Sequence, residues 1–128
     1  MKGTVMTVLA WILQGVLGLA FLAAGGMKLA QPRKKLIDSG MGWAEDFTDG
    51  PVKLIGAVEV LGAIGLVLPV LLGVAPVLTP IAAAGLTLLM AGAVVTHVRR
   101  GEYSGAVPSA VLGVLSLVVA ILRFGPLA

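Results

Sequence analysis

The sequence predicts an all-α fold, in which residues 1–128 form a single transmembrane domain, a four-helix bundle. The chain is 59% hydrophobic and 12% charged, whereas an ordinary soluble domain is about 45–50% apolar and about 25% charged. Its charges also lie almost entirely between apolar blocks. These observations exclude a soluble enzyme and a disordered tail. The absence of cysteine excludes a disulfide scaffold.

Four apolar blocks have about the length of a membrane-crossing helix. A hydrocarbon core of about 30 Å needs about 20 helical residues. The blocks are residues 5–27, 54–72, 80–98 and 106–122. Glu59 is the only formally charged residue inside any of them. Transmembrane β-strands would instead appear as alternating segments of about ten residues.

The ends of these blocks carry helix-boundary signals. The first block follows a basic residue, Lys2, as the apolar region of a secretory signal peptide does. It is longer than the roughly 7–15 apolar residues of such a peptide and has no clear cleavage site, so we expect that it is not cleaved off.

Prolines mark the boundaries of the other blocks. Pro69 falls in the last turn of the second block, and Pro80 opens the third. Pro108 lies in the first turn of the fourth. A proline in a first turn costs no hydrogen bond, because that N–H has no partner within the helix.

The distribution of basic residues predicts the orientation. Seven of the nine Lys and Arg residues lie in the loops 28–53 and 99–105 or at their edges, and the other two are Lys2 and Arg123. Because positive loops stay in the cytoplasm, we expect both loops to be cytoplasmic and both termini to be outside, in a bacterial plasma membrane. The net charge of +3 is therefore explained by basic loops on the cytoplasmic side and does not indicate nucleic-acid binding.

The loop 28–53 is the only substantial segment outside the apolar blocks. Trp43 and Phe47 stand four residues apart in it, and we expect them to lie together at the headgroups as interfacial anchors. A lid over a site is the alternative. Gly40, Gly42 and residues 50–51 (Gly-Pro) are expected to break the loop into short pieces.

Small residues surround Glu59 in the second block. A carboxylate in hydrocarbon costs roughly 2.5–3.5 kcal/mol on insertion scales, so Glu59 should point into the bundle. Three of its four helical neighbours at i±3 and i±4 are Gly or Ala, which is typical of close helix approach. The glycines expected to pack helices together are Gly18, Gly25, Gly56, Gly62, Gly65 and Gly92.

Two further helices bring polar residues toward Glu59. One face of the first block carries Gln14, Gly18, Phe21, Gly25 and Lys28, and one face of the third carries Leu86, Met90, Ala93, His97 and Arg100. Lys28, Glu59 and His97 therefore fall toward the same end of the bundle. Lys28, Glu59, His97 and Arg100 are the candidates for ligand binding or ion pairing. Two interpretations stay open. These residues form a functional site, or they only hold the helices together, as polar side chains in membrane helices also do. We expect no metal site, because one His and one Glu are fewer ligands than catalytic zinc uses.

The same residues resemble the DoxX-like family of small four-helix integral membrane proteins. The matching stretches are GGMKL (25–29), KLIGAVEVLGAIGLVLP (53–69), TPIAAAGL (79–86) and MAGAVVTHVRRGE (90–102). They cover three helices of the four. The family's recurring polar positions correspond to Lys28, Glu59, His97 and Arg100.

The resemblance implies a role beside an oxidoreductase. The family is named after a membrane subunit associated with archaeal thiosulfate:quinone oxidoreductase, and other relatives are linked to oxidative-stress assemblies or to membrane-protein assembly. We therefore expect an accessory membrane subunit, not an enzyme on its own, with no intrinsic cofactor and a quinone or lipid as ligand. Membrane lipids, an oxidoreductase subunit and a second copy of the chain are the expected partners. The alternatives are a proton-coupled small-molecule carrier and an assembly module without catalysis.

Overall fold

The computed structural model describes residues 2–128, which form five α-helices and one short 3₁₀-helix. The long helices are α1 (Lys2–Ala30), α3 (Asp49–Leu72), α4 (Leu78–Arg99) and α5 (Tyr103–Phe124). Between α1 and α3 lie the short helix α2 (Arg33–Asp38) and the 3₁₀-helix η1 (Gly42–Asp46). The predicted all-α fold with four membrane-spanning helices is confirmed.

Each long helix extends a few residues beyond its predicted apolar block. The largest difference is at α3, which begins at Asp49 instead of residue 54. Gly50 and Pro51 therefore lie in its first turn and do not break the loop, because a first-turn proline loses no helical hydrogen bond. At the other end, Gly73 takes the left-handed conformation (φ 66°) that stops the helix.

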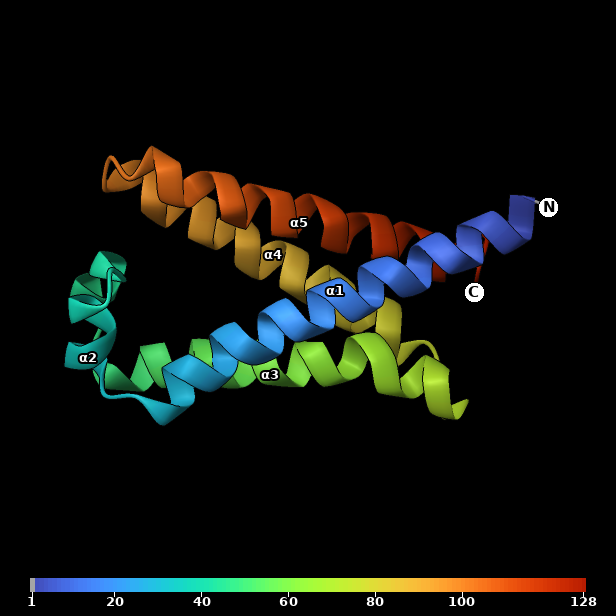
Figure 1. The fold of residues 1–128 in the computed structure, drawn as a ribbon, viewed down its shortest axis with the longest axis horizontal. Coiled ribbons are helices and arrows are strands. Elements are labelled where there is room, and N and C mark those ends of the chain that lie inside the picture. Colours follow the sequence, from blue (N-terminus) through green and yellow to red (C-terminus); the bar gives the residue numbers. More distant parts are fainter. Residues whose placement is uncertain (1) are drawn as a thin grey trace.

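The long helices form two packed pairs that meet at one end of the molecule. Helix α1 packs along α3, and α4 packs along α5 (Figure 1). The two pairs cross near the chain termini and separate toward α2 (Figure 1). We call the end with the termini the terminal end and the end with α2 the loop end.

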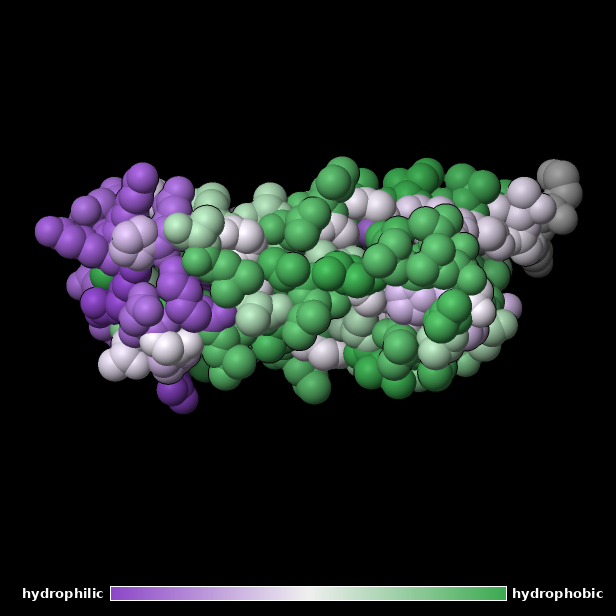
Figure 2. Space-filling model, turned by 90° about the horizontal axis from the view of Figure 1, so that it is seen from below, coloured by the Kyte–Doolittle hydropathy of each residue, from purple (hydrophilic) through white to green (hydrophobic). Residues whose placement is uncertain are grey.

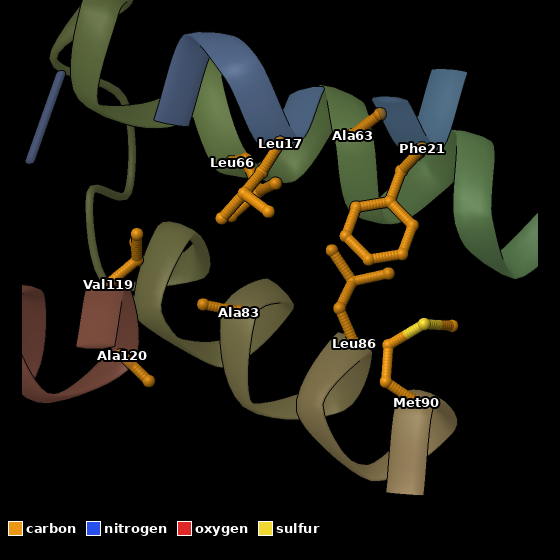
Figure 3. Packing of buried hydrophobic residues seen from close by; sticks show 9 residues of the cluster. All are labelled: Leu17, Phe21, Ala63, Leu66, Ala83, Leu86, Met90, Val119 and Ala120. Atoms are coloured by element: carbon orange, nitrogen blue, oxygen red, sulfur yellow. The ribbon is translucent and has the colours of Figure 1, made fainter. Parts of the chain in front are cut away.

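A buried apolar core joins all four long helices (Figure 3). Its residues are Leu17, Phe21, Ala63, Leu66, Ala83, Leu86, Met90, Val119 and Ala120. The Phe21 ring of α1 points toward Leu86 of α4 (Figure 3). Gly62 lets α4 approach α3 here, since a Cβ at this position would lie 2.7 Å from the Leu86 side chain. Helices α3 and α4 are therefore in close contact midway along α3.

The outer surface of the bundle is apolar over most of its length. Leu19, Leu61 and Leu88 are 72%, 67% and 75% exposed. Hydrophilic residues gather at the loop end, and hydrophobic ones cover most of the remaining visible face (Figure 2). Such a surface is stable in contact with lipid and not with water. The chain is an integral membrane protein whose helices contact lipid.

Residues 33–47 fold into a small unit at the loop end, which we call the cap. The Arg33 Nε atom donates hydrogen bonds to the carbonyl oxygens of Ala44 (2.9 Å) and Phe47 (2.6 Å), and so joins the two ends of the cap. Leu36 and Ala44 are fully buried together with Val52 of α3. The cap is thus an ordered unit held by its own hydrogen bonds and by a small apolar core.

Candidate functional site

Lys28 of α1 and Glu59 of α3 form a buried ion pair. The Lys28 Nζ atom lies 2.7 Å from Glu59 Oε1, and the two side chains are only 9% and 4% exposed. Close packing of two glycines makes this contact possible. A Cβ on Gly25 would lie 2.6 Å from the Gly56 carbonyl oxygen, and a Cβ on Gly56 would lie 2.8 Å from the Cβ of Lys28.

The ion pair leaves hydrogen-bonding capacity on the carboxylate. Lys28 Nζ, at 2.7 Å, is the only donor to Glu59 Oε1 among the described residues, and a carboxylate oxygen has two lone pairs with which to accept hydrogen bonds. A buried carboxylate oxygen normally accepts at least one directed hydrogen bond. The Glu59 carboxylate can therefore accept a further hydrogen bond from a ligand in the cavity that it lines.

A cavity of about 560 Å³ lies beside this pair, at the loop end where the two helix pairs separate. Its walls come from all four long helices and from the cap. Most of the lining is aliphatic or aromatic, with polar groups from Lys28, Glu59, Thr96, His97 and Ser109. Pockets of about 300–1,000 Å³ with apolar walls and a few polar groups are typical of small-molecule sites.

His97 lines the same cavity but does not contact the ion pair. Its Nδ1 atom lies 3.1 Å from Glu102 Oε1, just after the end of α4. The structure thus brings Lys28 and Glu59 together directly, and it places His97 on another wall of the space that they face. Sequence reasoning missed Glu102, because a charged residue in a short turn looks like an ordinary solvated one.

Arg100 lies outside the cavity and connects the cap to the turn between α4 and α5. Its guanidinium contacts Asp46 Oδ1 at 2.9 Å, Glu102 Oε2 at 3.0 Å and Glu45 Oε1 at 3.8 Å. These contacts raise the pKa of Arg100 above its ordinary value, mainly through the hydrogen bond to Asp46. We call Arg100, Glu102, Asp46 and Glu45 the latch.

Acid should weaken the latch. Hydrogen bonding to Arg100 holds the pKa of Glu102 below its ordinary 4.5, with a smaller contribution from His97. A carboxylate with a lowered pKa stabilises the fold fully above pH 4.5, and this stabilisation is lost as the pH falls through the lowered pKa. With Trp11→Phe leaving Trp43 as the only tryptophan, we expect Trp43 emission to change below pH 4.5. Glu102→Gln should reduce this change, and an identical titration curve in the variant would contradict the assignment.

Trp43 and Phe47 meet edge to face, with ring centroids 5.9 Å apart. Both rings are partly buried and line the cavity. The Trp43 ring centroid also lies 5.7 Å from Lys28 Nζ, a distance at which an ammonium group is attracted to an aromatic face. These two residues therefore form part of the cavity wall on the cap side, and their predicted role as interfacial anchors stays a prediction.

Five of the six glycines predicted to pack helices together do contact a neighbouring helix. An added Cβ at Gly18, Gly25, Gly56, Gly62 or Gly65 would lie within 3.3 Å of a neighbouring helix. Gly92 differs from the expectation that it packs helices, because no atom lies within 4 Å of its Cβ position. It is exposed and lines the cavity instead, since α4 has diverged from α3 at that point.

A second buried polar cluster lies at the terminal end. The Arg123 Nε atom donates to Gln14 Oε1 (2.9 Å), and Gln14 Nε2 donates to the Leu66 carbonyl oxygen (2.6 Å). Arg123 also lies over the Trp11 ring, 5.4 Å from its centroid. The sequence interpretation placed Arg123 outside the fourth span, whereas it lies in the last turn of α5 and is buried. Arg123 follows Ser116 by seven residues, which puts both on one helix face. This spacing is the signal in the sequence that could have indicated a buried Arg123.

A sequence model of the DoxX-like family matches residues 12–119, which include the ion pair, the cap and the latch. The chain belongs to the DoxX-like family. Neither the curated proteins nor the solved structures include a significant match. The described residues of this DoxX-like protein hold no group of three His, Asp or Glu side chains suited to a metal ion.

Proposed function

We propose that this DoxX-like protein is an accessory membrane subunit of an oxidoreductase assembly, and that it binds a quinone-like lipophilic molecule in the cavity beside Glu59. The observation that carries the proposal is a cavity of about 560 Å³ whose apolar walls hold one buried carboxylate, paired with a single lysine. Such a site favours a ligand with an apolar body and one polar head. The bilayer supplies molecules of this kind.

The polar groups suit a quinone or quinol head. Lys28 and His97 are hydrogen-bond donors that line the cavity and suit a ring carbonyl, while the Glu59 carboxylate can accept a hydrogen bond from a quinol hydroxyl. Trp43 and Phe47 add aromatic surface on the cap side, where a flat ring packs favourably. The aliphatic part of the lining would hold the tail of the ligand.

The chain itself lacks the residues for carrying electrons, which supports an accessory role. It has no cysteine for iron–sulfur ligation and only one histidine, so it cannot hold a haem between two histidines. Electrons would therefore come from a partner oxidoreductase. We place the loop end in the cytoplasm of a bacterium, because most of the Lys and Arg residues lie there.

A binding measurement tests the role of Glu59. With Trp11→Phe as the background, quenching of Trp43 by a short-chain ubiquinone or ubiquinol analogue reports binding in the cavity. A hydrogen bond to a charged group contributes about 1.5–3 kcal/mol, so Glu59→Gln should weaken quinol binding roughly ten- to hundredfold. Asp49→Asn, at an exposed position on the same helix, is the matched control and should bind normally.

The possible outcomes separate the alternatives. Equal quinol affinity in Glu59→Gln and Asp49→Asn would overturn the proposed site. A proton-coupled carrier would instead show flux of a water-soluble compound into liposomes that depends on Glu59. An assembly module would keep its function in Glu59→Gln and would bind no quinol in any variant.

A further inference from the structure

We propose that the ligand enters the cavity sideways from the bilayer, between α3 and α4, and that the cap closes the cavity to water with Arg100 as its positioning residue. This inference rests on the proposed function and specifies a ligand that is dissolved in the membrane. Three independent features of the structure support it.

The first feature is an opening on the lipid side of the cavity. Leu88 and Gly92 of α4 line the cavity, and both are exposed on the outer surface. Ile55 of α3 lines it on the opposite side. The close contacts that α3 makes with α4 at Gly62 and Gly65 lie nearer the terminal end than Ile55 does. In the loop-end half, therefore, the cavity reaches the surface that faces the hydrocarbon.

The second feature is the closure of the end that faces water. Met41, Trp43 and Phe47 of the cap form the cavity wall on this side. The cap spans the space between the α3 and α4–α5 ends of the bundle (Figure 1). Arg33 joins its two ends, and Leu36 and Ala44 bury it against α3. A water-soluble molecule would have to displace this wall in order to enter.

The third feature is how the cap is attached to the second helix pair. Its contact with α3 is apolar, whereas among the described residues its ion pairs to the α4–α5 side use Arg100, through Asp46 and Glu45. Glu102 fixes the Arg100 side chain from the other direction at 3.0 Å. Removing the guanidinium therefore releases one side of the cap, while Arg33 and the small apolar core keep the cap folded.

Single-cysteine labelling in liposomes tests this directly, because the chain has no cysteine of its own. Ala93→Cys places a thiol on the cavity wall, and Ser39→Cys places one on the exposed surface of the loop end. A charged, membrane-impermeant methanethiosulfonate reports access from water. An uncharged maleimide reaches the thiol from either phase, so its rate relative to that of the charged reagent reports how strongly the cavity excludes charged molecules from water.

We expect Ala93→Cys to react with the maleimide and to react at least tenfold more slowly with the charged reagent, relative to Ser39→Cys. Adding Arg100→Ala should raise the charged-reagent rate of Ala93→Cys at least tenfold. The matched control is Arg99→Ala, at the neighbouring exposed position. Asp46→Asn removes the same ion pair from the cap side and should give the same increase even if Arg100→Ala fails to fold.

Three results would overturn the inference. They are fast labelling of Ala93→Cys by the charged reagent with the latch intact, no labelling by the maleimide, and unchanged rates in Arg100→Ala and Asp46→Asn. Since labelling uses no ligand, any of these would leave the quinol measurement at Glu59 independent. Loss of quinol binding with normal labelling would instead contradict only the proposed function.

Discussion

Lys28→Ala should lower the free energy of unfolding by about 3–5 kcal/mol, the range for breaking a buried ion pair. Glu59 would be left in a site with 4% side-chain exposure and without its cation. Uptake of a proton by Glu59 would recover part of this loss, so the lower end of the range is expected under acid conditions. Reversible thermal or denaturant unfolding in detergent micelles measures the effect.

The double variant decides whether the two residues act as a pair. Lys28→Ala combined with Glu59→Gln should be no less stable than the worse single variant, because removing the second partner also removes the uncompensated charge. Lys35→Ala, at an exposed position of the cap, serves as the control and should change stability little. Additive losses in the double variant would show that Lys28 and Glu59 stabilise the protein independently.

Gly25→Leu should destabilise the protein by about 3 kcal/mol or more, at the upper end of the range for overpacked sites. Even a Cβ at this position would lie 2.6 Å from the Gly56 carbonyl oxygen and 2.9 Å from the Glu59 Cβ. These neighbours are backbone atoms or close to the backbone, so α1 and α3 would have to move apart. Their separation would also break the Lys28–Glu59 contact, and quinol binding should be lost as well.

Gly26→Leu is the matched control, one residue further along the same helix. No atom lies within 4 Å of a Cβ at Gly26, and leucine favours the helix over glycine. This variant should be as stable as the original chain or slightly more stable. If both variants had the same melting temperature, close α1–α3 packing would not be what holds the ion pair.

The fold was predictable because lipid imposes a simple rule on the sequence. A spanning helix needs about 20 apolar residues, and the four blocks met or approached this length. The position of Glu59 among small residues also indicated the approach of α1 through Gly25 and Gly56, since only small side chains allow two backbones so close.

The cap and the latch were not predictable in the same way. The cap depends on Arg33 donating to carbonyl groups eleven and fourteen residues away, and no local pattern specifies such a contact. Arg100 was selected as a candidate by its spacing, but its partners Asp46 and Glu45 come from another segment. Gly92 was read as a packing glycine because sequence does not reveal where two helices diverge.

An experimental structure of the protein extracted with its native lipids would show whether the cavity beside Glu59 holds a membrane-derived ligand with a polar head. We expect continuous density in the cavity, with one end within hydrogen-bonding distance of the Glu59 carboxylate and the other leading between α3 and α4. Mass spectrometry of the same sample should find a quinone-like molecule that Glu59→Gln loses. A cavity that is closed by its own side chains and holds no ligand density would contradict this assignment.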